Sequence, residues 1–370
     1  MEKVYDVHVH FTFEIPIDQT IEIFKEEFAV TGTEKYVFLS IPHDTGADKK
    51  SIYTDHMQNI KALYLKKEFS PNSYAFAGLI HPESYDDTEA VADEFLRQVK
   101  EYTNVGFDGI KMLEGYPSLL KLRNIPLDSP VYDKFYAFCE ENGIPIIAHI
   151  ANPAENWNIS KASKQAIKLG RVYDATYPTK EEITAQTFRV MEKFPKLRLG
   201  LAHCGFFAYD VKEAERFMEE YENTILDITP GGEQLLIMSE NWNIWKKFVE
   251  KYQDRIIYGT DYYAFQKNEN WEESFNRRPQ LIRNLFETDG EHFYLDKKFK
   301  GIKLDKNLRD KIYRENFMAF LGNPKEIDEN WLVLQAEKIL AEKKFRRQID
   351  KPDAEYIIKS LIIKREEVMK

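Results

Sequence analysis

The chain has little cysteine and no long hydrophobic run. Cys139 and Cys204 are its only cysteines, too few for a disulfide framework or for a zinc site built from thiolates. No apolar run approaches the length of a membrane span, and a strand pattern begins almost at Met1 in place of a signal peptide. We therefore expect a cytoplasmic protein without a membrane segment.

Basic residues are also in the minority. The 52 Lys and Arg residues stand against 62 Asp and Glu residues, which gives a formal net charge of −10. Such a balance disfavours a protein that binds nucleic acid or an anionic membrane surface. The chain shows neither an internal repeat nor a low-complexity segment. A small molecule is therefore the expected binding partner.

Apolar residues are plentiful enough for a large core. Hydrophobic residues make up 43% of the 370 residues and aromatic residues 14%, while charged residues of both signs account for 31%. This composition is typical of a soluble globular protein. The length fits one barrel-sized domain with an appendage.

Short apolar runs alternate with helical segments along the first 263 residues. Most runs are continuously apolar, as expected for parallel strands that are covered on both faces. Eight strand–helix repeats predict an α/β fold, a (β/α)8 TIM barrel. An open doubly wound sheet would need a Gly-rich turn after the first strand, where the chain instead has Phe11-Thr12-Phe13. The predicted strands are Val4–His10, Tyr36–Ile41, Tyr74–Ile80, Phe107–Leu113, Pro145–Ile150, Leu197–His203, Thr224–Ile228 and Ile256–Asp261.

The C-terminal part follows different patterns. Between Tyr262 and about Lys303 we predict an irregular excursion that either lies over the barrel mouth as a lid or packs outside. A last barrel helix is predicted over Leu304–Leu321, so the barrel domain spans residues 1–322. Residues 323–370 are predicted to form a helical extension of two amphipathic helices. Their apolar stripes must pack on the barrel or on a second subunit, and we expect a homo-oligomer, a dimer.

Histidines gather where the predicted strands end. His8 and His10 share one side of the first strand, because side chains alternate along a strand. His149, His203 and Asp261 end the fifth, sixth and eighth strands. Active sites of such barrels lie at this face, and imidazoles with one carboxylate are typical ligands of zinc or a similar divalent ion. Taken singly, each of these residues has a structural alternative, such as a hydrogen-bonded histidine or a helix-capping aspartate.

The order of these residues resembles the amidohydrolase superfamily, and more narrowly its amidohydrolase-related branch, which includes aminocarboxymuconate-semialdehyde decarboxylase. The resemblance covers roughly residues 1–322. It rests on Tyr5-Asp6-Val7-His8-Val9-His10, Gly109-Ile110-Lys111-Met112, Ile147-Ala148-His149, Leu201-Ala202-His203-Cys204-Gly205, Tyr258-Gly259-Thr260-Asp261 and Asn316-Phe317-Met318-Ala319-Phe320-Leu321-Gly322.

The resemblance implies roles for individual residues. It makes His8, His10, His149 and Asp261 ligands of a divalent metal, with zinc expected and manganese or another divalent ion as alternatives. His203 acts as an acid or base beside the metal-bound water in members with one metal. In members with two metals, His203 ligates the second ion, and a carboxylated Lys or a Glu on the fourth strand bridges the two. Lys111 and Glu114 are the candidates for that bridge, and we favour one ion. Asp6 is expected to support the ligands from behind.

The predicted activity is hydrolysis by a metal-activated water. Asp261 accepts a proton from this water, and His203 holds or shuttles that proton. The resulting hydroxide attacks an amide, lactone or ester carbonyl. The alternative within the branch is non-oxidative decarboxylation of a small aromatic or unsaturated carboxylate. An alternative of another class is a barrel that only binds a ligand. The residues predicted to contact substrate are Lys111, Phe11, His43, His81 and Tyr262, although for the last four the alternative is ordinary packing or loop solvation.

Overall fold

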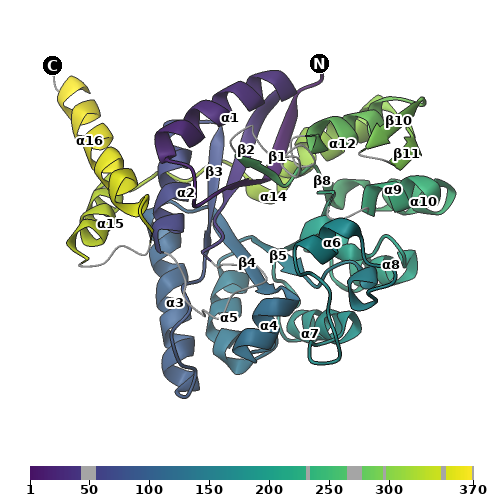
Figure 1. Ribbon diagram of the computed structural model, residues 1–370, viewed down its shortest axis with the longest axis horizontal. Helices are drawn as coiled ribbons and strands as arrows, with labels where there is room; N and C mark the ends of the chain where they lie inside the picture. Colours follow the sequence, from purple (N-terminus) through teal and green to yellow (C-terminus); the bar gives the residue numbers. More distant parts are fainter. Residues whose placement is uncertain (43–55, 231–233, 265–276, 295–296, 343–346, 369–370) are drawn as a thin grey trace.

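The computed structural model describes residues 1–370 except 43–55, 231–233, 265–276, 295–296, 343–346 and 369–370. Nine parallel strands form one curled sheet in the order β8-β7-β6-β5-β4-β3-β2-β1-β9, with helices around it (Figure 1). This is the predicted TIM barrel. The strands are β1 (Val4–Phe11), β2 (Thr33–Leu39), β3 (Ser73–Gly78), β4 (Gly109–Gly115), β5 (Ile146–Ile150), β6 (Leu199–Leu201), β7 (Ile225–Asp227), β8 (Ile256–Ile257) and β9 (Tyr262–Ala264).

The eighth strand differs from the single run predicted over Ile256–Asp261. The segment β8 pairs with β7, and after a break the segment β9 pairs with β1. At the break, the Val7 amide donates to the Tyr258 carbonyl at 3.0 Å, and the Asp261 amide donates to the His8 carbonyl at 2.8 Å. Asp261 has a φ of 53°, which an extended strand cannot accommodate. The interruption therefore lies at a candidate site residue.

Helices follow most strands, as predicted. The capping residues explain several boundaries: the Asp87 carboxylate accepts from the Ala90 amide at the start of α3, and Gly106 ends that helix with a φ of 111°. The helices are α1 (Ile17–Thr31), α2 (His56–Glu68), α3 (Thr88–Val105), α4 (Pro117–Arg123), α5 (Asp133–Glu141), α6 (Lys164–Lys168), α7 (Lys180–Lys193), α8 (Val211–Glu220), α9 (Gln234–Glu240), α10 (Trp242–Lys251), α12 (Arg278–Glu287), α13 (Lys306–Asp310) and α14 (Asn316–Leu321).

Two parts of the C-terminal half refine the sequence prediction. The region after β8 is less irregular than expected, because it contains α12 and an antiparallel strand pair, β10 (Glu291–Tyr294) with β11 (Lys297–Lys300). Residues 265–276 of the predicted lid lie outside the described residues. One turn of π-helix, Lys311–Glu315, joins α13 to α14, so the last barrel helix is continuous from Lys306 to its predicted end at Leu321.

The core has an inner and an outer layer. Inside the barrel, Val7, Val37 and Ile147 pack with Phe317 and Phe320 of α14. A larger cluster fills the space between the strands and the surrounding helices. The register between β1 and β2 shifts between Asp6 and Val9. Because of this shift, the side chains of the neighbouring residues Val7 and His8 both lie inside the barrel. The inner apolar layer thus forms a packed base beneath the histidines.

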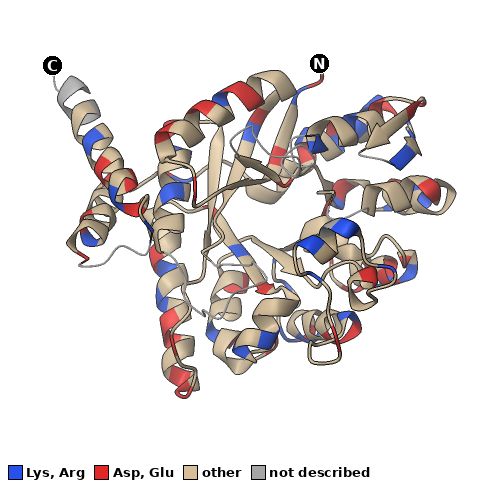
Figure 2. Ribbon diagram, viewed as in Figure 1, with Lys and Arg blue, Asp and Glu red and all other residues tan. Residues whose placement is uncertain are grey.

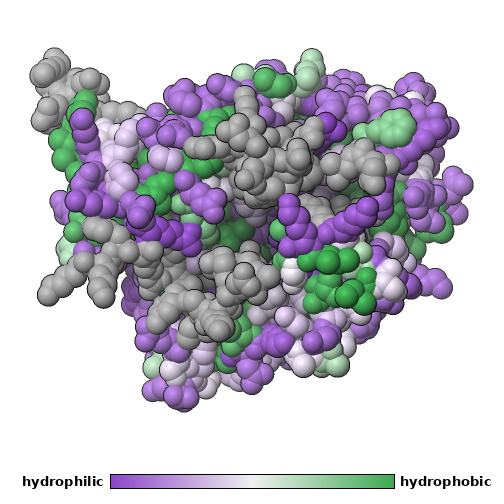
Figure 3. Space-filling model, in the orientation of Figure 1, coloured by the Kyte–Doolittle hydropathy of each residue, from purple (hydrophilic) through white to green (hydrophobic). Residues whose placement is uncertain are grey.

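The predicted C-terminal extension consists of α15 (Glu329–Ala341) and α16 (Asp350–Val368), which pack on each other and on α1 and α2 at one side of the barrel (Figure 1). Its partly exposed apolar side chains include Leu334 and Ile362. In the hydropathy view the visible surface is mostly hydrophilic, with separate hydrophobic patches, among them areas near α6 and α16 (Figure 3). Within the described residues, no helix combines the length and the hydropathy that crossing a membrane would require.

Candidate metal centre

The first strand delivers two imidazoles whose nitrogens face each other. The Nε2 atoms of His8 and His10 are 2.9 Å apart. Each Nδ1 atom lies beside an oxygen: that of His8 is 2.5 Å from Asp227 Oδ2, and that of His10 is 2.9 Å from the Leu39 carbonyl. The carbonyl can only accept, so His10 Nδ1 carries the proton and its Nε2 presents a lone pair. Burial raises the pKa of Asp227 to about 7, and in its ionised form Asp227 can only accept, so that the same then holds for His8.

This geometry fits a cation better than it fits a hydrogen bond. Two neutral imidazoles with protonated Nδ1 atoms have no proton to share between their Nε2 atoms. Burial, reinforced by the nearby ammonium of Lys111, holds the pKa of His8 well below its usual range, and burial does the same for the pKa of His10. Both rings are therefore neutral at pH 7. A divalent ion between the lone pairs would resolve the conflict.

Asp261 completes a group of three candidate ligands. Its Oδ1 atom is 3.5 Å from His8 Nε2 and 3.4 Å from His10 Nε2, and the ligand atoms of the three residues all lie within 4.8 Å of one another. Its Oδ2 atom contacts the guanidinium of Arg278, which also donates to the Asp261 carbonyl at 2.9 Å. Burial raises the pKa of Asp261, while the Arg278 charge counteracts that rise. Arg278 therefore supports the ionised carboxylate.

His149 and His203 lie next to this group, but each retains an unpartnered atom. The His203 ring is 5.4 Å from the His8 ring and 4.9 Å from the His149 ring. Among the described residues, neither His149 Nε2 nor His203 Nδ1 has a hydrogen-bond partner, although both are buried. Burial lowers the pKa of His149 to about 3. Buried nitrogens without partners are costly, and binding an ion or substrate there would remove the cost.

His203 does not extend the sixth strand to its predicted end. Strand β6 stops at Leu201, and His203, Cys204 and Gly205 all adopt left-handed conformations with φ values of 57°, 50° and 60°. For the two residues with side chains, this backbone is strained. Its effect is to turn the His203 ring toward His8 and His149.

Lys111 reaches the same site from β4. Its Nζ atom is 3.3 Å from His8 Nε2. Burial lowers its pKa to about 8, and the charges of Asp261 and Asp227 oppose that shift. A buried ammonium at this position can contact a substrate anion, and the neutral amine can be carboxylated to bridge two ions. Glu114, the other bridge candidate, instead lies 2.8 Å from His81.

A second layer of polar contacts holds the candidate ligands, and the sequence prediction included only part of it. Asp6 accepts from the His8 amide at 2.9 Å and from the Thr260 hydroxyl at 2.5 Å, so it ties β1 to the break in the eighth strand. Asp227 orients the His8 ring but was not predicted. Its position at the end of the seventh predicted strand could have indicated it, because metal-bound histidines commonly donate to a carboxylate.

Gly259 lies against the residues that hold the candidate ligands, and these neighbours leave no room for a side chain at its position. A Cβ atom there would lie 2.3 Å from Asp227 Oδ1 and 2.6 Å from Thr229 Oγ1. The Thr229 hydroxyl in turn lies 3.1 Å from His8 Nδ1. Glycine therefore permits the close approach that places the carboxylate behind His8.

Several predicted substrate contacts lie elsewhere. Phe11 and Tyr262 are buried in the hydrophobic core, and the ring of Tyr262 lies 6.1 Å from that of Phe24. Since side chains alternate along β9, Tyr263 faces the centre instead, with its ring 4.7 Å from that of His10. The predicted role of Phe11 and Tyr262 as pocket walls does not fit this packing.

The two other predicted substrate contacts are His81 and His43. His81 is buried, with its Nε2 atom 2.8 Å from Glu114 Oε1 and its Nδ1 atom 2.5 Å from the Tyr85 hydroxyl. Both ring nitrogens are thus occupied by protein groups, which disfavours a substrate contact. His43 lies outside the described residues.

Arg171 is a cation near the site that the sequence did not predict. It lies in the connection between β5 and α7, and its guanidinium is 5.9 Å from the centre of the Tyr116 ring. Burial works against its charge, but the nearby Tyr116, Tyr263 and Tyr173 and the carboxylate of Asp261 raise its pKa. The segment lacks a local motif, so no sequence signal placed it at the site.

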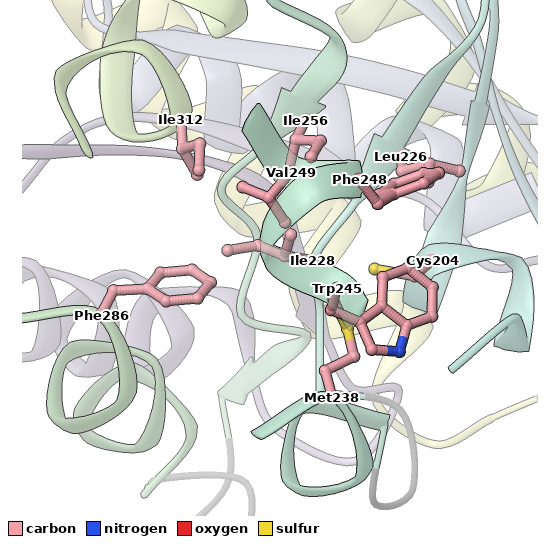
Figure 4. Close-up of a pocket in the computed structure, with 10 residues that line it drawn as sticks. All are labelled: Cys204, Leu226, Ile228, Met238, Trp245, Phe248, Val249, Ile256, Phe286 and Ile312. Carbon is pink, nitrogen blue, oxygen red and sulfur yellow. The ribbon is translucent and has the colours of Figure 1, made fainter. Parts of the chain in front are cut away.

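A small apolar cavity lies away from this chemistry. Figure 4 shows Trp245, Met238 and Cys204 around one part of it, with Phe286 and Ile312 on another side. Its lining offers no charged or metal-ligating side chain apart from the Cys204 thiol, whose pKa burial raises. The cavity is therefore a gap in the packing between strands and helices and not a substrate site.

A parallel barrel with imidazoles and a carboxylate converging beyond its strand ends defines the class of metal-dependent barrel enzymes. The chain belongs to the amidohydrolase family, whose model matches residues 5–322. That match ends where the C-terminal extension begins. No curated protein matches the chain in sequence.

Solved structures with the same fold include two enzymes named for acids. 4-Oxalomesaconate hydratase from Rhodopseudomonas palustris is 15% identical with a TM-score of 0.52, covering 92% of this chain and 100% of its own. A dihydroxybenzoic acid decarboxylase from Polaromonas, solved with manganese and an inhibitor, is 17% identical with a TM-score of 0.51, covering 87% and 97%. The IDCase of Metarhizium anisopliae is 12% identical with a TM-score of 0.53, covering 86% and 97%. At these identities the comparison establishes the fold alone.

Proposed function

We propose that this protein is a metal-dependent hydrolase that acts on an amide, lactone or ester carbonyl of a small molecule. The observation that carries the proposal is the position of Asp261. One of its oxygens faces the Nε2 atoms of His8 and His10, and the other is held by Arg278. A carboxylate paired with a guanidinium favours its ionised form and is a proton acceptor. Hydrolysis needs such an acceptor beside the reacting water.

The ion would be held by His8, His10 and Asp261, whose ligand atoms converge, with His149 as the fourth ligand. When bound, a divalent ion would polarise the carbonyl and acidify water, and zinc or manganese suits these donors. Asp261 would then accept the proton of the attacking water. His203, whose Nδ1 atom has no partner among the described residues, would hold that proton for the leaving group.

Lys111 supplies the remaining charge. Its Nζ atom lies beside His8, where an ammonium would stabilise negative charge that develops on the substrate oxygen. The inner apolar layer and Tyr263 limit the access of bulk water from below and from one side, which strengthens these interactions.

Non-oxidative decarboxylation is the second candidate. The observation in its favour is again Lys111, because an ammonium beside the metal ligands can also anchor a substrate carboxylate at the reacting position. The fold accommodates this reaction, since one neighbour of the same fold is named as a dihydroxybenzoic acid decarboxylase with bound manganese.

The test is a turnover panel with zinc-loaded and manganese-loaded protein. Neutral amides, lactones and esters are compared with aromatic carboxylates, with the acid product followed in the first group and carbon dioxide in the second. Hydrolysis that disappears in Asp261→Asn but persists in His292→Gln, a histidine outside the site, supports the proposal. Carbon dioxide without hydrolysis would assign the second candidate, and no turnover at all would favour a ligand-binding barrel.

A further inference from the structure

Tyr116, between β4 and α4, has a buried hydroxyl without a protein partner. The residue is only 3% exposed, and among the described residues its hydroxyl makes no hydrogen bond. The nearest polar group is the Tyr173 hydroxyl, whose pKa is raised by burial and then by Tyr116. That hydroxyl already accepts from the Asn152 side chain at 2.7 Å. A buried phenol without a partner costs stability, and a ligand that accepts its proton would remove this cost.

The side chain of Tyr116 borders the metal centre. Its ring lies 5.2 Å from the ring of His149, the candidate fourth ligand, whose Nε2 atom also has no partner among the described residues. Tyr263, with its ring 4.7 Å from that of His10, lies on another side of the centre. Burial and the Asp261 carboxylate raise the pKa of Tyr263, and Tyr116 adds to that rise. Tyr116 is therefore close to both sides of the centre.

The backbone holds Tyr116 in this position. The strands β4 and β5 lie side by side, and at their ends the Ala151 amide donates to the Gly115 carbonyl at 3.0 Å (Figure 1). A Cβ atom at Gly115 would lie 2.4 Å from the His149 carbonyl oxygen, so glycine permits this close approach. The Tyr116 amide donates to the Leu113 carbonyl at 2.9 Å. Tyr116 is thus fixed beside His149 before a ligand arrives, as an effective electrostatic donor must be.

A second donor approaches the centre from β4. Lys111 Nζ is 3.3 Å from His8 Nε2, and after burial its charge is the next cause that lowers the pKa of His149. Lys111 and Tyr116 therefore reach the candidate ligands at His8 and at His149. Figure 2 shows the charged residues mainly on the helices, while the strands of the barrel are largely uncharged. Hydrogen-bond donors act strongly in such surroundings, because water and competing charges are few.

We propose that Tyr116 is a catalytic residue that donates a hydrogen bond to the substrate oxygen on which negative charge develops. Attack on the carbonyl carbon moves the electron pair of the double bond to this oxygen. The phenol stabilises the new charge and keeps its own proton, so no bond to Tyr116 forms or breaks. Lys111 acts on the same oxygen from the side of His8. The inference rests on the proposed function, since it concerns a residue of the same reaction.

The experiment compares Tyr116→Phe with Tyr132→Phe in the zinc-loaded full-length protein. Tyr132 is a matched control, because its hydroxyl is also buried without a partner among the described residues. Its ring, however, stacks on that of Phe95 at 5.4 Å, in the layer between the strands and the helices. Each substitution removes one unpartnered hydroxyl, so neither should lower the free energy of unfolding. Urea unfolding and zinc content establish that both variants are folded and loaded.

Two quantities are measured: kcat and KM for a neutral ester, and the calorimetric affinity for methylphosphonate, whose charged tetrahedral oxygens resemble the developing oxyanion. We expect Tyr116→Phe to lower kcat about 10²-fold with little change in KM, the usual loss for one oxyanion donor. Methylphosphonate should bind about tenfold more weakly. Tyr132→Phe should change neither quantity. Equal values in the two variants would overturn the inference, and so would a higher KM at unchanged kcat, which would mean that the hydroxyl contacts only the neutral substrate.

The two proposals fail in different ways. If methylphosphonate binding depends on Tyr116 but no ester, amide or lactone is hydrolysed, Tyr116 stands as a donor to an anionic oxygen and the proposed hydrolase does not. If hydrolysis occurs with the same kcat in Tyr116→Phe as in the unaltered protein, the hydrolase stands and the role of Tyr116 does not. Neither turnover nor methylphosphonate binding by the unaltered protein would contradict both.

Discussion

Two regions of this molecule that contain buried charged side chains surround them differently. Where α16 packs on the barrel, Lys61 Nζ lies 2.7 Å from Asp353 Oδ2 and 3.1 Å from the Ile15 carbonyl, and Asp353 also accepts from the Ile17 amide. At the metal centre, by contrast, the His8 and His10 lone pairs face each other, and His149 keeps an unpartnered nitrogen.

The difference separates a structural role from a functional one. A buried charge that is paired and hydrogen-bonded within the protein stabilises one arrangement of the chain, as Lys61 and Asp353 do for the C-terminal extension. A group of buried donors that lacks partners costs stability unless something else binds to it. Substitutions at the centre should therefore change metal binding and activity, whereas substitutions at the extension should change stability.

The largest effect is expected at the centre. His10→Ala, or removal of the ion by a chelator, should lower kcat/KM about 10³-fold or more, because metal-ion catalysis supplies several kcal/mol of transition-state stabilisation. The unfolding free energy of the metal-free protein should change little, since the substitution removes one of two opposed lone pairs. Kinetics and urea unfolding of the metal-free protein measure the two quantities. If His10→Ala lost much stability and kept its metal, the centre would have a structural role like that of the extension, and the distinction between the two regions would be wrong.

The next effect is expected at the extension. Asp353→Ala leaves the Lys61 ammonium buried without its carboxylate, and it should destabilise the protein by about 3 to 5 kcal/mol. Bound metal per folded chain should stay the same. Denaturant unfolding of the single variant is compared with that of Lys61→Met/Asp353→Leu, which should recover most of the loss. A single variant as stable as the unaltered protein would show that this pair does not secure α16.

A smaller effect on metal affinity is expected at Asp227, which lies beside the His8 ring. Asp227→Asn keeps the shape of the side chain but removes the charge beside His8 Nδ1, and it should weaken metal affinity about 10- to 100-fold. Competition with a chromogenic chelator measures this affinity, with Asp353→Ala as the control that should leave it unchanged. An unaltered affinity in Asp227→Asn would mean that the ring is oriented by other contacts.

The smallest effect concerns association. We propose a dimer, as the apolar stripes of the extension suggest, so the full-length chain should sediment at twice its mass of 43.7 kDa. Leu334→Glu, which charges an exposed position of α15, should weaken the dimer about tenfold without loss of metal. A monomer at all accessible concentrations would contradict the proposal.

The sequence predicted the barrel and its C-terminal helices because strand patterns, helix periodicity and stop signals act locally. It also brought His8, His10 and Asp261 to one place, since strand ends of a parallel barrel converge. It could not predict the break after β8, which depends on the positive φ of Asp261 and on its contact with β1. Arg171 was missed for a similar reason, because its position depends on how a long connection folds over the site.

The sequence was less informative about aromatic residues near the strand ends. It could not distinguish Tyr262 from its neighbour Tyr263, since only the pairing of β9 with β1 decides which ring faces inward. Packing likewise decided that Phe11 belongs to the core. The side-chain direction of a residue in a short strand follows from tertiary contacts that no single segment encodes.

The most direct test of the central claim is the metal content of purified protein after loading with zinc and exhaustive dialysis, measured by mass spectrometry. The account predicts about one ion per chain in the unaltered protein and in Asp353→Ala, and almost none in His10→Ala. Unaltered protein that retains no ion, or His10→Ala that retains as much as the unaltered protein, would contradict the claim that these converging donors form a metal centre.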